Sequence, residues 1–116
     1  MEAETWQAIL VGGLIANAVI GLGYRIYRRT KGGPIGDVWG QAVLGGLLVA
    51  VAIGVALGAT WLRWAGFAYA VLFGLLVMPI WVLGVLLPMR PRAIDYSFTI
   101  TYWAVLIAIG VAALLV

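Results

Sequence analysis

Four long runs of this sequence contain no charged residue, and they constrain the fold more than any other feature. The runs cover residues 5–24, 38–62, 64–89 and 96–116, and they are 20, 25, 26 and 21 residues long. A helix needs about 20 apolar residues to cross the roughly 30 Å hydrocarbon core of a bilayer. Lipid offers no hydrogen-bonding partner, so a spanning run must satisfy its backbone groups internally, as a helix does. The runs therefore predict four transmembrane helices.

The composition excludes several classes of protein. The chain has 116 residues, of which 66% are hydrophobic and 9% are charged, whereas soluble domains carry about 25% charged residues. A small globule buries the smallest share of its chain, so it would leave much of this apolar surface in water. We therefore exclude a soluble enzyme and a disordered tail. The chain has no cysteine, which also excludes a disulfide scaffold.

Arg63 is the single charged residue between the second and third runs. If residues 38–89 formed one helix, it would be about 78 Å long at 1.5 Å per residue. Because that length is more than twice the thickness of the hydrocarbon core, the chain must reverse near residues 60–66. Trp61, Trp64 and Phe67 flank Arg63, and tryptophan is typical of the membrane–water interface. This pattern predicts a tight interfacial hairpin.

The sequence therefore predicts an all-α, integral membrane four-helix bundle made of two antiparallel transmembrane hairpins. Residues 1–116 form a single transmembrane domain, with spans at about 5–28, 38–60, 65–88 and 96–116. Asp37 and Asp95 each come just before a span. A carboxylate is favourable at a helix N-terminus because the exposed backbone dipoles are positive there. We interpret both residues as N-caps or first-turn anions.

Six of the seven cationic residues lie in two connections that share one face of this layout: Arg25, Arg28, Arg29, Lys31, Arg90 and Arg92. Cytoplasmic loops carry an excess of Lys and Arg. We therefore expect loops 29–37 and 89–95 to be cytoplasmic and both termini to be outside, in the cytoplasmic membrane of a prokaryote. The basic loops predict contact with the lipid bilayer and its anionic headgroups, and we expect no nucleic-acid partner.

Small residues recur every four positions in three of the spans. Such spacing lets helix backbones approach closely in lipid, where no hydrophobic force drives helices together. We interpret these positions as a packing face within the chain, or alternatively as the face of an oligomer or of a partner subunit. They are Gly46, Ala50, Gly54 and Gly58 in the second span, Gly66, Ala70 and Gly74 in the third, and Ala104, Ala108 and Ala112 in the fourth.

A few residues within the spans are candidates for a polar path or a ligand pocket. Pro79 follows Met78 inside the third span, where proline removes a backbone donor and kinks the helix. Trp81 either fills the wedge beside this kink or lines a pocket for a lipophilic ligand. Asn17 and Gln41 are polar residues within the first two spans. Interhelical hydrogen bonding is the interpretation we favour for both, and a conduction or substrate path is the alternative.

No Asp, Glu, Lys, Arg or His lies near the centre of any span, which argues against a proton-coupled pump. Histidine and cysteine are absent from the whole chain, so this chain alone offers no Ser–His or Cys–His pair for nucleophilic catalysis. We therefore expect no enzyme activity, metal or cofactor. The favoured hypothesis is a structural, accessory or interaction subunit of a membrane assembly. The alternatives are a small homo-oligomeric transporter or passive channel, and a binder of a lipophilic ligand such as a quinone, carotenoid or lipid.

Overall fold

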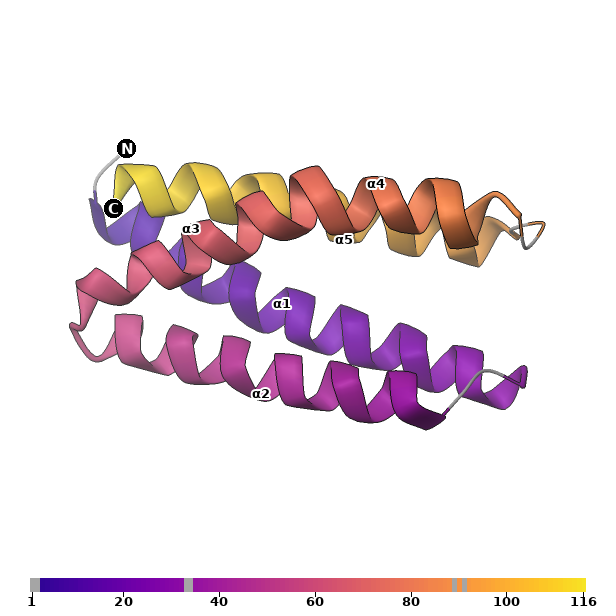
Figure 1. Ribbon diagram of the computed structural model, residues 1–116. Coiled ribbons are helices and arrows are strands. Elements are labelled where there is room, and N and C mark those ends of the chain that lie inside the picture. Colours follow the sequence, from indigo (N-terminus) through magenta and orange to yellow (C-terminus); the bar gives the residue numbers. More distant parts are fainter. Residues whose placement is uncertain (1–2, 33–34, 89, 91) are drawn as a thin grey trace.

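The computed structural model describes residues 3–32, 35–88, 90 and 92–116 (Figure 1). All regular structure within these residues is helical. The first, second and fourth spans are the helices α1 (Ala3–Thr30), α2 (Ile35–Ala56) and α5 (Ala93–Leu115). The third span joins α3 (Arg63–Leu72), a π-helical segment (Phe73–Val77), α4 (Met78–Trp81) and a second π-helical segment (Val82–Leu86).

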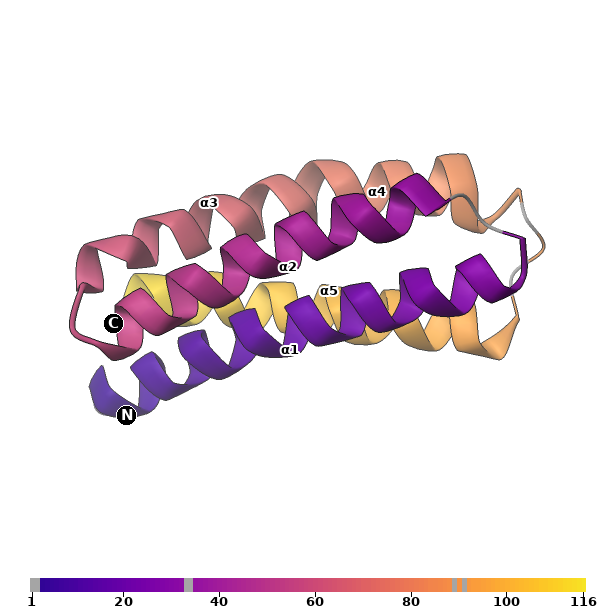
Figure 2. The same cartoon turned by 90° about the horizontal axis from the view of Figure 1, so that it is seen from below.

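Four helical stretches of the described chain are long and apolar enough to cross a membrane, as the sequence predicts. They are Glu4–Thr30, Val38–Ala56, Arg63–Leu86 and Ala93–Leu115. Successive spans run in opposite directions (Figures 1 and 2). The molecule is 42 Å long, which matches the roughly 40–45 Å thickness of a bilayer with its headgroups.

The spans are arranged so that α1 packs between α2 and α5, and α5 packs between α1 and the third span (Figure 2). Both chain termini lie at one end together with the α2–α3 hairpin, and we call this the terminal end. The α1–α2 and α4–α5 connections lie at the other, which we call the loop end (Figure 1). The second and third spans meet at the hairpin and diverge toward the loop end.

The α2–α3 hairpin lies close to its predicted position. Helix α2 ends at Ala56, and a short 3-10 turn (Thr60–Leu62) leads into α3. Gly58 has a φ of 104°, and the amide of Ala59 donates to the carbonyl of Gly54 at 2.9 Å. This is the glycine-terminated helix end in which a left-handed residue stops the helix. Gly58 is therefore a helix-ending residue. Packing within the chain is the wrong interpretation for it, because a Cβ added there would meet nothing within 4 Å, and the alternative of an oligomer or partner face stays a prediction.

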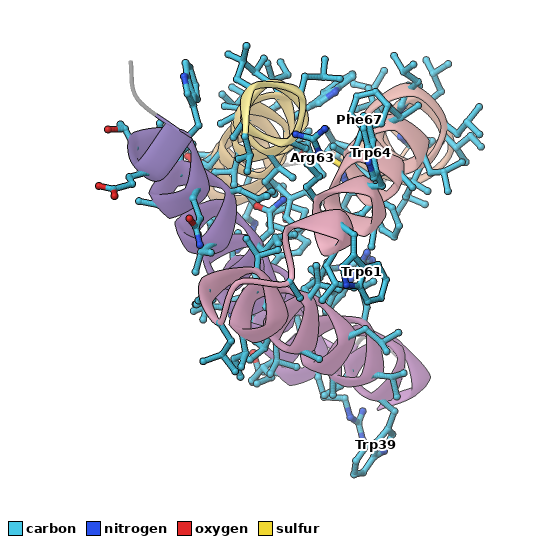
Figure 3. All side chains as sticks on the ribbon, turned by 90° about the vertical axis from the view of Figure 1, so that its left-hand side faces the viewer. Trp39, Trp61, Arg63, Trp64 and Phe67 are labelled. Carbon is cyan, nitrogen blue, oxygen red and sulfur yellow. The ribbon has the colours of Figure 1, made fainter. Side chains whose placement is uncertain are left out.

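Arg63 and its aromatic neighbours gather at the terminal end (Figure 3). The Arg63 guanidinium lies 4.6 Å from the centroid of the Trp64 ring, and Trp64 meets Phe67 edge-on at 5.9 Å. The indoles of Trp61 and Trp64 are exposed. Exposed tryptophans beside a half-buried cation at the end of a span suit the headgroup region, so the geometry is compatible with an interfacial hairpin.

Apolar side chains fill the terminal half of the bundle. Five of them are at most 1% exposed: Leu10, Leu14, Val55, Leu106 and Ile109. The glycine face of α3 lies against this core. A Cβ atom on Gly66 would lie 3.1 Å from Leu10 Cδ1, and one on Gly110 would lie 3.5 Å from Ala70 Cβ. The small residues Gly66 and Ala70 thus allow close packing within the chain.

The small residues of α2 face outward instead. Gly46 and Ala50 are exposed, and a Cβ added at Gly46 would meet nothing within 4 Å. The buried face of α2 is offset from the predicted one and consists of Gly45, Leu48, Ala52 and Val55. Packing within the chain is therefore the wrong interpretation for Gly46 and Ala50.

The remaining predicted small residues divide between the interior and the surface. Gly54 makes room for Leu62 of the hairpin, because an added Cβ would lie 2.3 Å from its Cδ1. Gly74 is half-buried beside Trp103. In α5, Ala112 is fully buried. Packing within the chain is wrong for Ala104 and Ala108, which are exposed.

Candidate functional site

A buried polar cluster lies inside the bundle, and each span contributes one residue to it. Asn17 comes from α1, Gln41 from α2, Tyr69 from α3 and Tyr102 from α5. Asn17 Nδ2 donates to the Tyr69 hydroxyl at 3.1 Å, and the Tyr69 and Tyr102 hydroxyls are hydrogen-bonded to each other. The Gln41 side chain lies beside Tyr102. The interhelical hydrogen bond predicted for Asn17 is therefore present.

Two atoms of this cluster are buried without a hydrogen-bond partner in the described part of the chain. They are the acceptor Asn17 Oδ1 and the donor Gln41 Nε2. An unsatisfied buried polar atom is costly, and in native proteins it often marks the place of a water, an ion or a ligand. The amide of Gln41 also packs directly on α1, since a Cβ on Gly21 would lie 2.3 Å from Nε2.

Gln41 lies in the wall of a cavity between the four spans. The cavity has a volume of about 60 Å³. A single water needs roughly 10–15 Å³ of such space, so the cavity has room for a small polar guest. Its described lining residues are Arg25 of α1, Gln41 of α2, Phe98 and Tyr102 of α5, and Phe73, Val77, Met78 and Trp81 of the third span.

Trp81 is buried on the loop-end side of this cavity. Its indole Nε1 donates to Thr99 Oγ1 at 3.2 Å, and Tyr24 and Phe98 meet its ring edge-on. The guanidinium carbons of Arg25 and Arg28 lie 4.8 and 5.1 Å from the centroid of its ring system. Trp81 therefore packs in an aromatic cluster and lines the cavity, whereas the lipophilic ligand suggested for it stays a prediction.

Asp95 ties α5 to α1 at the loop end. Its Oδ2 accepts a 2.8 Å hydrogen bond from the backbone amide of Arg92, which confirms it as a first-turn anion. Its Oδ1 accepts a hydrogen bond from the hydroxyl of Tyr24. One carboxylate therefore satisfies the start of α5 and also links two spans. The side chain of Asp37, interpreted in the same way from the sequence, lies outside the described residues.

Pro79 cannot donate a backbone hydrogen bond to the carbonyl of Gly74, and Trp103 donates one in its place. In the π-helical segment before Pro79, the amide of Met78 donates to the carbonyl of Phe73, five residues earlier. The next bond in this register would join residue 79 to Gly74, but proline has no amide hydrogen. The indole Nε1 of Trp103 donates to the Gly74 carbonyl at 3.1 Å. An indole from α5 therefore satisfies the freed carbonyl.

The predicted basic residues divide between this interior site and the surface of the loop end. Arg25 and Arg28 are half-buried beside Trp81, as described above. Lys31 Nζ lies 5.9 Å from the centroid of the Tyr27 ring. The four exposed basic residues are Arg29, Lys31, Arg90 and Arg92.

Sequence reasoning missed the tyrosines of the interior. The position of Tyr24 near a span end favours an interfacial aromatic, yet its side chain is only 5% exposed, and those of Tyr69 and Tyr102 are 7% and 3% exposed. The useful signal is that Tyr69 and Tyr102 lie well inside apolar runs, where a hydroxyl needs a partner. The described residues contain no group of three or more His, Cys, Asp or Glu side chains able to hold a metal ion.

Comparisons with protein-family models, with curated proteins and with solved structures found no match to this chain. The site is therefore interpreted from its own geometry. That geometry provides the aromatic walls of a small cavity together with the polar side chains of Arg25, Gln41 and Tyr102.

Proposed function

We propose that this protein is a non-catalytic subunit of a membrane assembly, and that it binds its partner through the outer face of α2. The partner is either a second copy of this chain or another membrane protein. We define the α2 face by its exposed residues Trp39, Val43, Gly46, Leu47, Ala50 and Ile53. Trp39 points away from the bundle at the edge of this face (Figure 3).

The observation that carries this proposal is the outward orientation of the small residues of α2. Small residues let another helix approach closely, and nothing within the described chain lies above Gly46. α2 is also the least enclosed span, with 22% of its most apolar window buried compared with 33% for α1 and α5. A helix with a free small-residue face supports the interpretation as an interaction subunit.

The interior supports this proposal more than a conducting path. Fully buried apolar side chains such as Leu14, Val55 and Ile109 fill the described terminal half of the bundle, which disfavours a polar path through it. The cavity of about 60 Å³ is also much smaller than the roughly 300–1,000 Å³ of pockets for drug-sized ligands. A quinone or carotenoid inside this cavity is therefore disfavoured.

Bulky substitutions on the α2 face test the proposed assembly. Gly46→Leu and Ala50→Leu are expected to separate the protein from its partner in mild detergent while leaving the unfolding midpoint unchanged or slightly raised. A Cβ added at Gly46 would meet nothing within 4 Å, and Ala50 is exposed. At Gly46, replacing glycine in a helix also stabilises the helix by up to about 1 kcal/mol. The matched control is Ala68→Leu, which changes an exposed alanine of α3.

Native purification with light scattering and mass spectrometry reads out this experiment. A discrete complex of the wild type that is lost in Gly46→Leu but kept in Ala68→Leu supports the proposal. A wild-type protein that is monomeric and purifies alone contradicts it. A complex that survives both substitutions on the α2 face places the interface elsewhere and contradicts it as well.

We also propose that the loop end faces the cytoplasm and that both termini lie outside. The basis is the segregation of six basic residues at the loop end against Arg63 at the terminal end. Because the natural chain has no cysteine, single cysteines at Lys31 and Leu57 can report each end separately. In intact cells a membrane-impermeant maleimide should label Leu57→Cys and spare Lys31→Cys. The reverse pattern would contradict this orientation.

A further inference from the structure

A groove on the surface of the bundle runs between α1 and α5, which lie side by side in opposite directions (Figure 2). It has a volume of about 340 Å³, and its lining comes from residues 19–27 of α1 and 94–101 of α5. None of the described lining residues is charged, and the polar side chains among them carry only hydroxyl groups. Val19 and Thr101 are exposed, so the groove opens outward and not into the interior.

The length and depth of this α1–α5 groove correspond to one leaflet of a bilayer. Between Val19 and Tyr27, α1 rises about 12 Å at 1.5 Å per residue, which is most of the roughly 15 Å of hydrocarbon in one leaflet. Tyr27 is near the end of α1 and Ile94 is the second residue of α5. The groove therefore begins near the loop end and runs inward along the direction of a lipid chain.

A lysine lies at the outer end of the groove. Lys31 directly follows α1, is exposed, and has its Nζ 5.9 Å from the centroid of the Tyr27 ring, which lines the groove. A cation at the membrane surface attracts anionic lipid headgroups, whereas an uncharged groove suits a hydrocarbon chain. The positive charge and the apolar groove thus follow one another in the order of the headgroup and the chain of a phospholipid.

Gly23 keeps the groove open on the side of α1. It is exposed, and a Cβ added there would meet nothing within 4 Å. An empty groove would deprive its lining residues of van der Waals contacts, so an apolar group of the membrane has to fill it. A flexible acyl chain is the group that a bilayer supplies at this depth. The described lining includes no residue of α2, so the groove is separate from the α2 face.

We propose that the α1–α5 groove binds one anionic phospholipid from the leaflet at the loop end. One acyl chain of this lipid lies in the groove along Gly23, and its phosphate lies beside Lys31. This binding is independent of the proposed assembly, because the α2 face takes no part in it.

Titration of the detergent-solubilised protein with lipid, followed by native mass spectrometry, tests the proposal. The probes are dioleoyl phosphatidylglycerol and dioleoyl phosphatidylcholine, which have the same acyl chains and differ in the net charge of the headgroup. Phosphatidylglycerol should form a saturable complex with one lipid per chain. Phosphatidylcholine should bind with a dissociation constant about fivefold higher, since it lacks the net charge that one lysine attracts.

Two glycines of α1 provide a matched pair of variants for the acyl chain. Gly23→Leu fills the groove and should abolish saturable binding of both lipids. The control is Gly12→Leu, because Gly12 is also exposed, also meets nothing within 4 Å at an added Cβ, and lies outside the groove. This control should bind lipid as the wild type does. If Gly23→Leu fails to fold, Ser97→Leu fills the groove from α5 and should have the same effect.

A second pair of variants tests the headgroup. Lys31→Gln should raise the dissociation constant for phosphatidylglycerol about fivefold, to the value for phosphatidylcholine, because it removes the cation at the outer end of the groove. Arg90→Gln removes another exposed cation of the loop end and should leave the preference for phosphatidylglycerol unchanged.

Three results would overturn the proposal. The first is lipid binding without saturation or without a preference between the two headgroups, because either would describe ordinary lipid around the bundle. The second is equal binding by the wild type, Gly23→Leu and Ser97→Leu, which would place the lipid elsewhere. The third is a bound polypeptide that is lost in Gly23→Leu and kept in Gly12→Leu, since a protein would then occupy the groove.

Discussion

The hydrogen bond from Tyr24 to Asp95 provides the sharpest test of how the loop end is held together. It joins α1 to α5 across 71 residues of sequence, and Asp95 is only 9% exposed. Replacing Tyr24 with phenylalanine removes the hydroxyl and keeps the ring that stacks on Phe98 at 3.9 Å. Tyr24→Phe therefore isolates the hydrogen bond from the packing.

The expected cost follows from the type of hydrogen bond and from its surroundings. Hydrogen bonds to charged groups contribute about 1.5–3 kcal/mol, whereas those between membrane helices reach at most about 1.7 kcal/mol. We therefore expect Tyr24→Phe to destabilise the fold by about 1.5 kcal/mol, where the two ranges meet. Asp95→Ala also removes the helix-capping interaction, worth about 1 kcal/mol, so its total should be about 2.5 kcal/mol.

Unfolding in mixed micelles with increasing dodecyl sulfate, followed by circular dichroism, measures these differences. The double variant should be about as stable as Asp95→Ala alone, because the hydroxyl has lost its acceptor. Tyr27→Phe is the matched control, since Tyr27 stacks on Tyr24 with ring centroids 6.2 Å apart, and it should cost less than 0.5 kcal/mol. Additive effects of Tyr24→Phe and Asp95→Ala would refute the reasoning.

Two further substitutions test how the backbone is stabilised beside Pro79 and at the end of α2, and the same unfolding measurement applies to both. Trp103→Phe should cost about 1 kcal/mol, because it leaves the Gly74 carbonyl without its indole donor. In a Pro79→Ala background this cost should fall, since an amide hydrogen becomes available for the carbonyl, and an unchanged cost would contradict the assigned role. Gly58→Ala should lower the free energy of unfolding by about 1 kcal/mol, because alanine is strained at the positive φ of this position. The control Gly46→Ala should not lower it. Equal effects of the two substitutions would argue against the helix-ending role of Gly58.

The positions of the spans are predictable from this sequence because charge is so scarce in it. A charge inside the hydrocarbon core is expensive, so the charge-free runs bracket the helices, and Arg63 marks the hairpin. Asp95 is predictable as a first-turn anion for a related reason, since its effect on the helix end is local. Features that depend on how deep a residue lies in the membrane, or on a single helix end, can therefore be predicted from the sequence alone.

The rotation of each helix about its own axis is much harder to predict. A span that is apolar on every side has no polar face to mark its exterior. The positions of small residues are then the only sequence signal for which face of the helix is buried. In α2 that guide selected Gly46 and Ala50, but the buried face runs through Gly45 and Ala52. The tyrosines of the interior were missed for the same reason, because Tyr24 near a span end is compatible with both an interfacial and an inward position.

In the third span, the two π-helical segments are a further reason why the inward-facing residues are hard to predict. At 100° per residue, a regular α-helix that points Gly66 inward would turn Met78 about 120° and Leu86 about 200° away from that direction. Each π-helical segment inserts one extra residue into the helix, which subtracts about 100°. After the first segment Met78 returns to about 20°, and after the second Leu86 returns to about 0°. Both side chains are in fact almost fully buried, at 3% and 2% exposed.

The two π-helical segments therefore explain how one helix keeps a single inner face on both sides of Pro79. They also affect the wall of the cavity. Met78 lies between the segments, and the rotation from the first segment brings its side chain to the inner face with Gln41 and Tyr102. Without that rotation the carbonyl of Gly74 would keep an amide partner one turn later, but Met78 would point about 120° away from the inner face. The irregularity of the third span thus places Met78 in the wall of the interior site.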